Sequence, residues 1–151
     1  MNSTTVHTGL IAAAVIAFFC TWGSFQPQFD LPPEMAGLGA GMTFDITGWN
    51  GTFTLIGITM PIWLIVVLTV LGGSFLMTNA NGTTAIPKAV NISLFAIPLV
   101  FTVFGLITLL ATGSPGLGVL IAAAASATGL AMSIRDEEAG VVEIAAPPAR
   151  F

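Results

Sequence analysis

The distribution of apolar and polar residues along the chain predicts four membrane-spanning helices. A transmembrane helix needs about 20 consecutive, mostly apolar residues, within a range of about 17–25. Four stretches that contain no Asp, Glu, Lys or Arg meet this requirement. They are too long for strands and lack the strict alternation that the strands of a membrane β-barrel show. The predicted helices cover residues 8–25, 52–77, 89–111 and 116–134.

The segments between the predicted helices set the arrangement of the bundle. Only residues 112–115 separate the third helix from the fourth, so these two helices must form an antiparallel hairpin, and Pro115 suits a helix start. A long loop over residues 26–50 joins the first helix to the second. We therefore predict an all-α integral membrane protein, with an antiparallel four-helix transmembrane domain over residues 1–134 and a flexible acidic tail over residues 135–151.

The composition makes a lipid bilayer the expected solvent of this chain. Hydrophobic residues make up 55% of the sequence and charged residues 7%, whereas soluble domains carry about 25% charged residues. The mean hydropathy is +0.97. Such a chain cannot cover a water-facing surface with polar groups. With three bases and a net charge of −4, it also lacks the basic patch of a nucleic-acid-binding protein.

The few basic residues predict an orientation. Lys88 lies between the second and third predicted helices, and Arg135 and Arg150 follow the fourth. With four spans, all three bases fall on one side of the membrane, which the positive-inside rule assigns to the cytoplasm. We therefore expect both termini in the cytoplasm and the loop over residues 26–50 outside.

Stripes of small residues predict where helices pack closely. Lipid tails provide no hydrophobic drive between helices, so association depends on close approach through small side chains. These stripes could meet each other or receive another subunit. They are Gly9, Ala13, Ala17 and Thr21 in the first predicted helix, and Gly118, Ala122 and Ser126 together with Ala125, Gly129 and Ser133 in the fourth.

The second and third predicted helices each carry a mildly polar face that contains a proline. A proline inside a helix removes one backbone donor and frees a carbonyl, so the two faces could satisfy each other when they pack. They could also line a narrow polar path or hold a ligand headgroup. The residues of this possible path are Thr54, Thr69, Asn91 and Thr102.

Aromatic side chains near the expected outer boundary resemble an interfacial belt. Trp22, Trp49 and Phe53 lie close to the ends of the predicted spans, where amphipathic rings are common. Trp63 lies deeper, and its indole N–H needs a partner.

Catalytic chemistry requires converging titratable groups, and this chain offers few. We expect no catalytic residue and no metal site. His7 is the only histidine; it could be a single axial ligand of a haem or chlorophyll-type pigment, or an ordinary interfacial residue. Asp30, Glu34 and Asp45 do not follow the spacing of an ion-binding loop, and we assign them to docking. Cys20, the only cysteine, is expected to pack.

Residues 29–42, FDLPPEMAGLGAGM, are expected to form a compact element at the membrane surface. Asp30 can cap a short turn, and Glu34 is favourable near the positive end of that turn. The glycines that follow would soon end it. This element is therefore either a docking cap with an acidic rim or a spacer.

The predicted topology, with four helices, a long first outer loop and both ends inside, resembles that of claudin-type tetraspans. The paired cysteines that those proteins carry in this loop have no counterpart here. Small multidrug transporters have a comparable helix count, but their glutamate in the first helix is also missing. The sequence therefore assigns the chain to no family.

The function that fits these features is a non-catalytic accessory subunit of a larger integral-membrane complex, energy-converting or transporting. Such a subunit would dock through its small-residue helix faces and through the loop over residues 26–50. A self-associating pore or transporter is the alternative, although a proton-coupled transporter normally has a charge inside the membrane. A pigment- or lipid-binding scaffold is a third possibility. The expected partners are the lipid bilayer and other membrane subunits or copies of this chain.

Overall fold

The computed structural model describes residues 3–25, 43–80 and 86–145, and the side chains of residues 5–25, 43–80 and 86–135. The fold is mostly helical, with a small amount of sheet. Its helices are α1 (Ser3–Phe19), α3 (Ile62–Ala80), α4 (Lys88–Thr112) and α5 (Leu117–Ala145). Its strands are β1 (Thr21–Phe25), β2 (Phe44–Thr47), β3 (Thr52–Leu55), β4 (Ile58–Pro61) and β5 (Gly113–Pro115).

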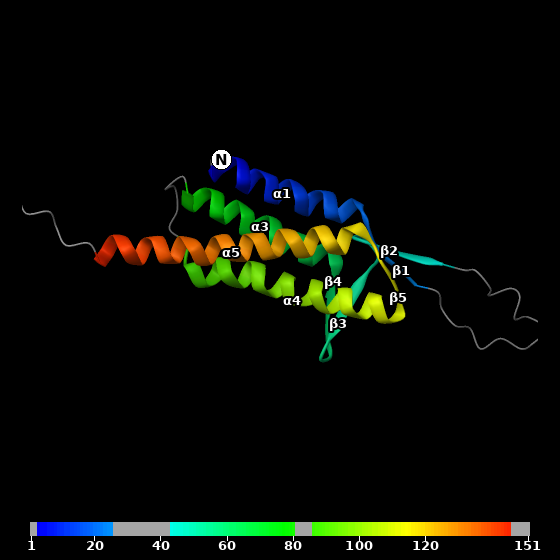
Figure 1. The fold of residues 1–151 in the computed structure, drawn as a ribbon. Coiled ribbons are helices and arrows are strands. Elements are labelled where there is room, and N and C mark those ends of the chain that lie inside the picture. The colour runs from blue at the N-terminus through cyan, green and yellow to red at the C-terminus, as the bar shows by residue number, and fades with distance from the viewer. Residues whose placement is uncertain (1–2, 26–42, 81–85, 146–151) are drawn as a thin grey trace, which may run out of the picture.

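The four helices lie side by side, and the strands gather at one end of them (Figure 1). We call this end the sheet end and the other the opposite end. α1 packs against α3 and α5, and α4 packs against the same two helices. Glycines mark the close contacts: Gly73 of α3 meets Leu10 and Ile11 of α1, and Gly118 of α5 meets Ala17 near the other end of α1. Neighbouring helices in the bundle therefore run antiparallel.

Three helices in the described part of the chain are long and apolar enough to cross a membrane. They are α3, α4 and the Leu117–Arg135 part of α5. α1 is also apolar, but at 17 residues it is shorter. The helices therefore point to a bilayer environment, and the prediction of four spans stays a prediction.

The prediction that the first helix continues through residues 21–25 is wrong, because the chain leaves the helix after Phe19 and forms β1. β1 pairs antiparallel with β2 on one side and β5 on the other, in the order β2-β1-β5. Its backbone donors and acceptors are thus satisfied by neighbouring strands instead of by a helix. Trp22 of β1 is completely buried. Its large apolar side chain explains why the apolar run, and with it the predicted helix, continued past Phe19.

The prediction that a helix starts at residue 52 is also wrong. Residues 52–61 form a separate two-stranded antiparallel sheet, β3-β4, and α3 begins only at Ile62. Ile56 and Gly57 form the turn, both with positive φ (50° and 79°), as a two-residue hairpin with matching twist requires. Pro61 directly precedes the helix, where its missing N–H costs little.

The third and fourth predicted helices match the structure more closely. The predicted range 89–111 lies inside α4, and α5 starts one residue after the predicted residue 116. α5 continues to Ala145, whereas a flexible tail was predicted from residue 135; acidic residues and alanine are compatible with a helix that extends beyond its apolar part. Residues 146–151 lie outside the described part of the chain.

The long loop predicted over residues 26–50 contains strand β2 and a turn in its described part, residues 43–50. Residues 26–42 lie outside the described residues, and with them Asp30, Glu34 and the FDLPPEMAGLGAGM element. The short link between α4 and α5 is also a strand, β5, which pairs with β1. A Cβ added at Gly113 or Gly116 would overlap the backbone of residues 21–25. Small residues here therefore allow the α4–α5 link to lie directly against β1.

Two apolar clusters fill the bundle. The larger one lies toward the sheet end and includes Trp22, Phe53 and Ile62. The smaller one, formed by Leu10, Leu76 and Phe95, lies toward the opposite end. The predicted aromatic belt is thus wrong for Trp22 and Phe53, which are 0% and 6% exposed and belong to the core.

Candidate functional site

The small-residue stripes of α5 pack inside the chain. A Cβ at Gly118 would lie 2.6 Å from Cδ1 of Trp22, and a Cβ at Gly129 would overlap the ring of Phe95. The structure therefore places the two glycines of these stripes against other elements of the same chain. The other buried members of the two stripes are Ala122, Ala125, Ser126 and Ser133.

The stripe predicted in the first helix is divided in the structure. Ala17 is completely buried and Ala13 is half-buried, but Gly9 is exposed. A Cβ built at Gly9 would meet no heavy atom of the described residues within 4 Å. Thr21 has left the helix and is exposed in β1. The Gly9 end of the stripe is thus the part that remains open at the surface.

The residues of the possible polar path do not come together. Thr54 is exposed on β3 and shares a 3.0 Å hydrogen bond with Thr59. The hydroxyl of Thr69 donates to the carbonyl of Ile65 at 2.9 Å and lies 3.3 Å from the hydroxyl of Ser126. The hydroxyls of Thr54 and Thr69 are thus bonded to partners outside the predicted path.

Thr102 and Asn91, the two path residues on α4, also lie apart from each other. The hydroxyl of Thr102 donates to backbone carbonyls of its own helix, at 2.9 Å to Pro98 and 3.0 Å to Leu99. Asn91 lies about three helical turns away, near the start of α4. The hydroxyl of Thr102 is thus satisfied within α4, and the two interpretations of this polar face stay predictions.

His7 and Asn91 are buried at the opposite end of the bundle, each 3% exposed. His7 lies one helical turn from Leu10 in α1, and Asn91 lies one turn from Phe95 in α4. In both pairs the polar residue is farther from the sheet end than the apolar one. Ser133 lies one turn beyond Gly129, which contacts Phe95. We call His7, Asn91 and Ser133 the polar layer.

The polar layer contains two atoms without a partner among the described residues, Nδ1 of His7 and Oδ1 of Asn91. The hydroxyl of Ser133 donates to the carbonyl of Gly129 at 2.9 Å. His7 is therefore a buried group near the start of α1. Within the described ranges, no three His, Cys, Asp or Glu side chains gather as metal ligands would.

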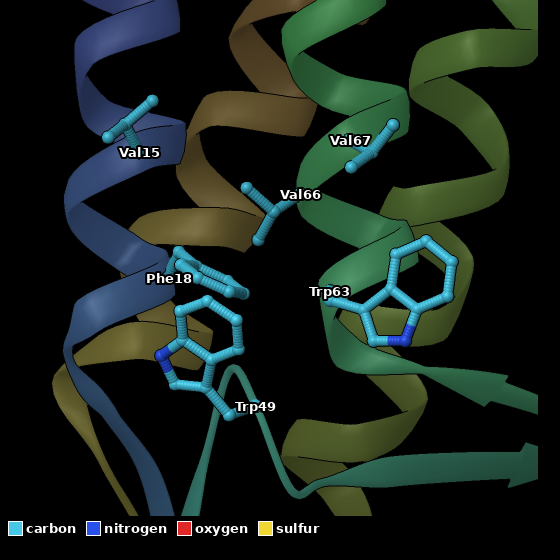
Figure 2. Close-up of a pocket in the computed structure, with 6 residues that line it drawn as sticks. All are labelled: Val15, Phe18, Trp49, Trp63, Val66 and Val67. Atoms are coloured by element: carbon cyan, nitrogen blue, oxygen red, sulfur yellow. The ribbon is translucent and has the colours of Figure 1, made fainter.

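An apolar groove of about 590 Å³ lies between α1 and α3 at the sheet end. We call it the α1–α3 groove. Figure 2 shows its two sides: Phe18 and Trp49 on the side of α1, Trp63 and Val67 on the side of α3, and Val66 between them. The rings of Phe18 and Trp49 are in contact, with centroids 4.5 Å apart and planes tilted by 60°. Its lining residues are Val15, Phe18, Trp49, Trp63, Val66 and Val67.

A hydrogen-bonded turn holds Trp49 over the end of α1. The side-chain oxygen of Asn50 accepts from the backbone N–H of Thr47 at 2.8 Å and from its hydroxyl at 3.1 Å. The amide of Asn50 donates to the carbonyl of Asp45 at 3.3 Å. A Cβ at Gly48 would overlap the carbonyl of Phe18. The absence of a side chain at Gly48 therefore lets the turn lie directly on the last turn of α1.

A second, smaller groove of about 310 Å³ lies between α1 and α5. We call it the α1–α5 groove. Its surface is formed largely by small side chains, and Gly9, Ala124 and Thr128 are exposed along it. Gly9 and Ala13 of this groove are the open part of the stripe predicted in the first helix. Its lining residues are Val6, Gly9, Leu10, Ala13, Ile121, Ala124, Ala125 and Thr128.

Sequence reasoning missed the α1–α3 groove as a unit. Val15, Phe18, Val66 and Val67 lie in long apolar runs, where each one looks like any other lipid-facing or core residue. The available signal was the pair Trp49 and Trp63, which flank residues 50–62. Their proximity depends on the hairpin β3-β4, which the predicted helix over residues 52–77 excluded.

Comparison of the chain with protein-family models, with curated proteins and with solved structures finds no match. The two grooves and the polar layer are thus the features from which function must be argued.

Proposed function

We propose that this chain is a four-span, non-catalytic accessory subunit of a larger integral-membrane complex, of an energy-converting or transport type. As a fourth span, α1 would cover about 26 Å, from its 17 residues and the 1.5 Å rise of a helix. This length is close to the hydrocarbon thickness of about 30 Å. α1 also packs against both α3 and α5.

The proposed orientation places the opposite end in the cytoplasm and the sheet end outside. Lys88 and Arg135 are both exposed at the opposite end, at the start of α4 and beyond the apolar part of α5. Basic residues next to spans favour the cytoplasmic side.

The observation that carries the proposal is the α1–α5 groove. Exposed small residues allow a neighbouring transmembrane helix to approach closely, which is the main way that helices gain van der Waals contact in lipid. The stripes of α5 are used within the chain, so docking is assigned to this groove instead of to every small-residue face. The exposed carboxylate of Asp45 at the sheet end remains a candidate for contact with a partner outside the membrane.

Mild-detergent purification of the full chain from its native membrane, followed by mass spectrometry, tests this proposal. We expect one or more stoichiometric membrane subunits. Gly9→Leu should abolish their retention without disturbing the fold, because no described atom lies within 4 Å of the Cβ position. Ala12→Leu is the matched control, since Ala12 is exposed on the same helix outside the groove.

Three outcomes would contradict the accessory-subunit proposal. A homogeneous homo-oligomer without another subunit would favour the self-associating pore. Equal retention of partners by Gly9→Leu and Ala12→Leu would exclude the α1–α5 groove as the docking site. Visible absorbance that disappears in His7→Ala, with no partner protein, would favour a pigment scaffold.

A further inference from the structure

The α1–α3 groove lies where the apolar helices meet the sheet end. Its walls come from the last turns of α1, which provide Val15 and Phe18, and from the first turns of α3, which provide Trp63, Val66 and Val67. α3 is one of the helices long and apolar enough to cross a membrane. If the chain is inserted as proposed above, this end of the spans would lie near the headgroups of one leaflet. The groove would then open toward the adjoining part of the lipid tails.

The chemistry of the groove fits a lipid tail with an oxygen acceptor at its headgroup end. Every residue that lines it is aliphatic or aromatic. Its volume of about 590 Å³ falls in the range of small-molecule sites, about 300–1,000 Å³. Trp49 and Trp63 are 71% and 48% exposed, so a large part of each indole side chain is accessible to a ligand. Such rings combine an apolar body with one polar donor and are common at the lipid–water boundary.

The groove is a formed feature of the fold and not simply a gap between two helices. The turn that carries Trp49 is fixed by the hydrogen bonds of Asn50, and its ring rests on Phe18. Leu71, one helical turn beyond the groove residue Val67, is 41% exposed, so exposed aliphatic surface continues along α3 from the groove. Membrane lipids would cover such a surface in a bilayer, so we expect a lipid to occupy the groove.

We propose that the α1–α3 groove binds one tail of a bilayer lipid from the leaflet at the sheet end. The tail lies against Val66, between Phe18 and Trp63. The indole N–H of Trp49 or Trp63 donates to an oxygen where the tail joins the headgroup. This inference rests on the proposed insertion of the chain in a bilayer, but it does not depend on a protein partner.

Quenching of tryptophan fluorescence by lipids with brominated tails tests the proposal. The purified full chain is placed in liposomes that contain a rising mole fraction of brominated lipid. Trp22 is 0% exposed, and its own quenching, measured in the Trp49→Phe/Trp63→Phe double variant, is the reference. Trp63→Phe leaves Trp49 as the groove reporter, and Trp49→Phe leaves Trp63. We expect a saturable component in which groove lipid is preferred over the host lipid by about tenfold, equivalent to about 1.4 kcal/mol.

A pair of groove variants provides the matched control. Val67 lines the groove and Val90 does not, although both are 42% exposed valines in helices. Val67→Phe should remove the saturable component, and Val90→Phe should retain it. Val15→Phe, from the opposite wall, should act like Val67→Phe. The emission of buried Trp22 reports whether each variant is folded.

Quenching that rises only in proportion to the mole fraction of brominated lipid would overturn the proposal, because that result describes ordinary boundary lipid. Equal quenching in Val67→Phe and Val90→Phe would overturn it as well. So would native mass spectrometry that finds a polypeptide in the groove, released by Val67→Phe, in place of one retained lipid. Failure of the accessory-subunit proposal is distinguishable, since Gly9→Leu should lose the partner and leave the lipid quenching unchanged.

Discussion

The two ends of the helix bundle differ in whether their buried polar atoms have hydrogen-bond partners. At the sheet end, the indole of Trp22 is completely buried, and its N–H donates to the carbonyl of Ala17 at 2.8 Å. At the opposite end, His7 and Asn91 are almost as deeply buried, but one polar atom of each has no partner among the described residues. A buried polar group that is paired contributes stability, whereas an unpaired one costs about 1–3 kcal/mol.

The difference arises from how the chain crosses each end. At the sheet end, β1 runs across the bundle and carries the Trp22 ring into contact with Gly118, while β5 closes the link between α4 and α5. Side chains there are positioned by strands that contact several helices at once. At the opposite end, His7, Asn91 and Ser133 each come from a different helix, and no described strand holds them in place. We therefore expect the sheet end to dominate stability and the polar layer to reduce it.

The largest effect is expected for Trp22→Ala. This change removes a completely buried ring and leaves a cavity in the larger apolar cluster, so the free energy of unfolding should fall by about 3–5 kcal/mol. Steric trapping in bicelles measures this quantity directly. Trp49→Ala is the control: its ring is 71% exposed, and the loss should stay below about 1 kcal/mol. Equal losses for the two variants would show that the sheet end is not the centre of stability.

The opposite effect is expected for Asn91→Leu in the polar layer. Leucine has a similar size and removes the unpaired Oδ1, so the free energy of unfolding should rise by about 1–2 kcal/mol. Ser93→Leu is the control, because Ser93 is exposed on the same helix. A loss of stability in Asn91→Leu would instead show that Oδ1 has a partner in the membrane, such as bound water, and that the contrast between the two ends is smaller than proposed.

The sequence predicts helices well where apolar runs have clear borders. α4 is preceded by Pro87, begins at Lys88 and is followed by the Gly113–Pro115 link, so its bounds were predicted to within one residue. Hydropathy alone does not distinguish a buried strand from a helix, which explains why β1 was assigned to the first helix. The polar–apolar alternation in β3 was hidden within a longer apolar run.

A more specific reason explains why the β3-β4 hairpin and the α1–α3 groove beside it could not be predicted from the sequence. The turn of β3-β4 is formed by Ile56 and Gly57, and a β-branched residue with positive φ is uncommon, so the usual Asn-Gly or Asp-Gly signal is missing. The position of Trp49 depends on side-chain hydrogen bonds of Asn50 with Thr47 and Asp45. Such bonds depend on the conformation of the turn, which the pattern of apolar and polar residues does not specify.

The smallest effect that separates the two halves of the bundle is expected for Thr69→Val. Its hydroxyl joins α3 to α5 through Ser126, at 3.3 Å, between the larger apolar cluster and the polar layer. Hydrogen bonds between membrane helices contribute about 0.6 kcal/mol on average, and valine preserves the shape, so the free energy of unfolding should fall by about that amount.

Thr108→Val is the control, because Thr108 is exposed and its hydroxyl bonds to the carbonyl of Phe104 in its own helix. A double-mutant cycle with Ser126→Ala isolates the coupling; a value of zero would mean that the hydroxyls of α3 and α5 pack side by side without stabilising each other.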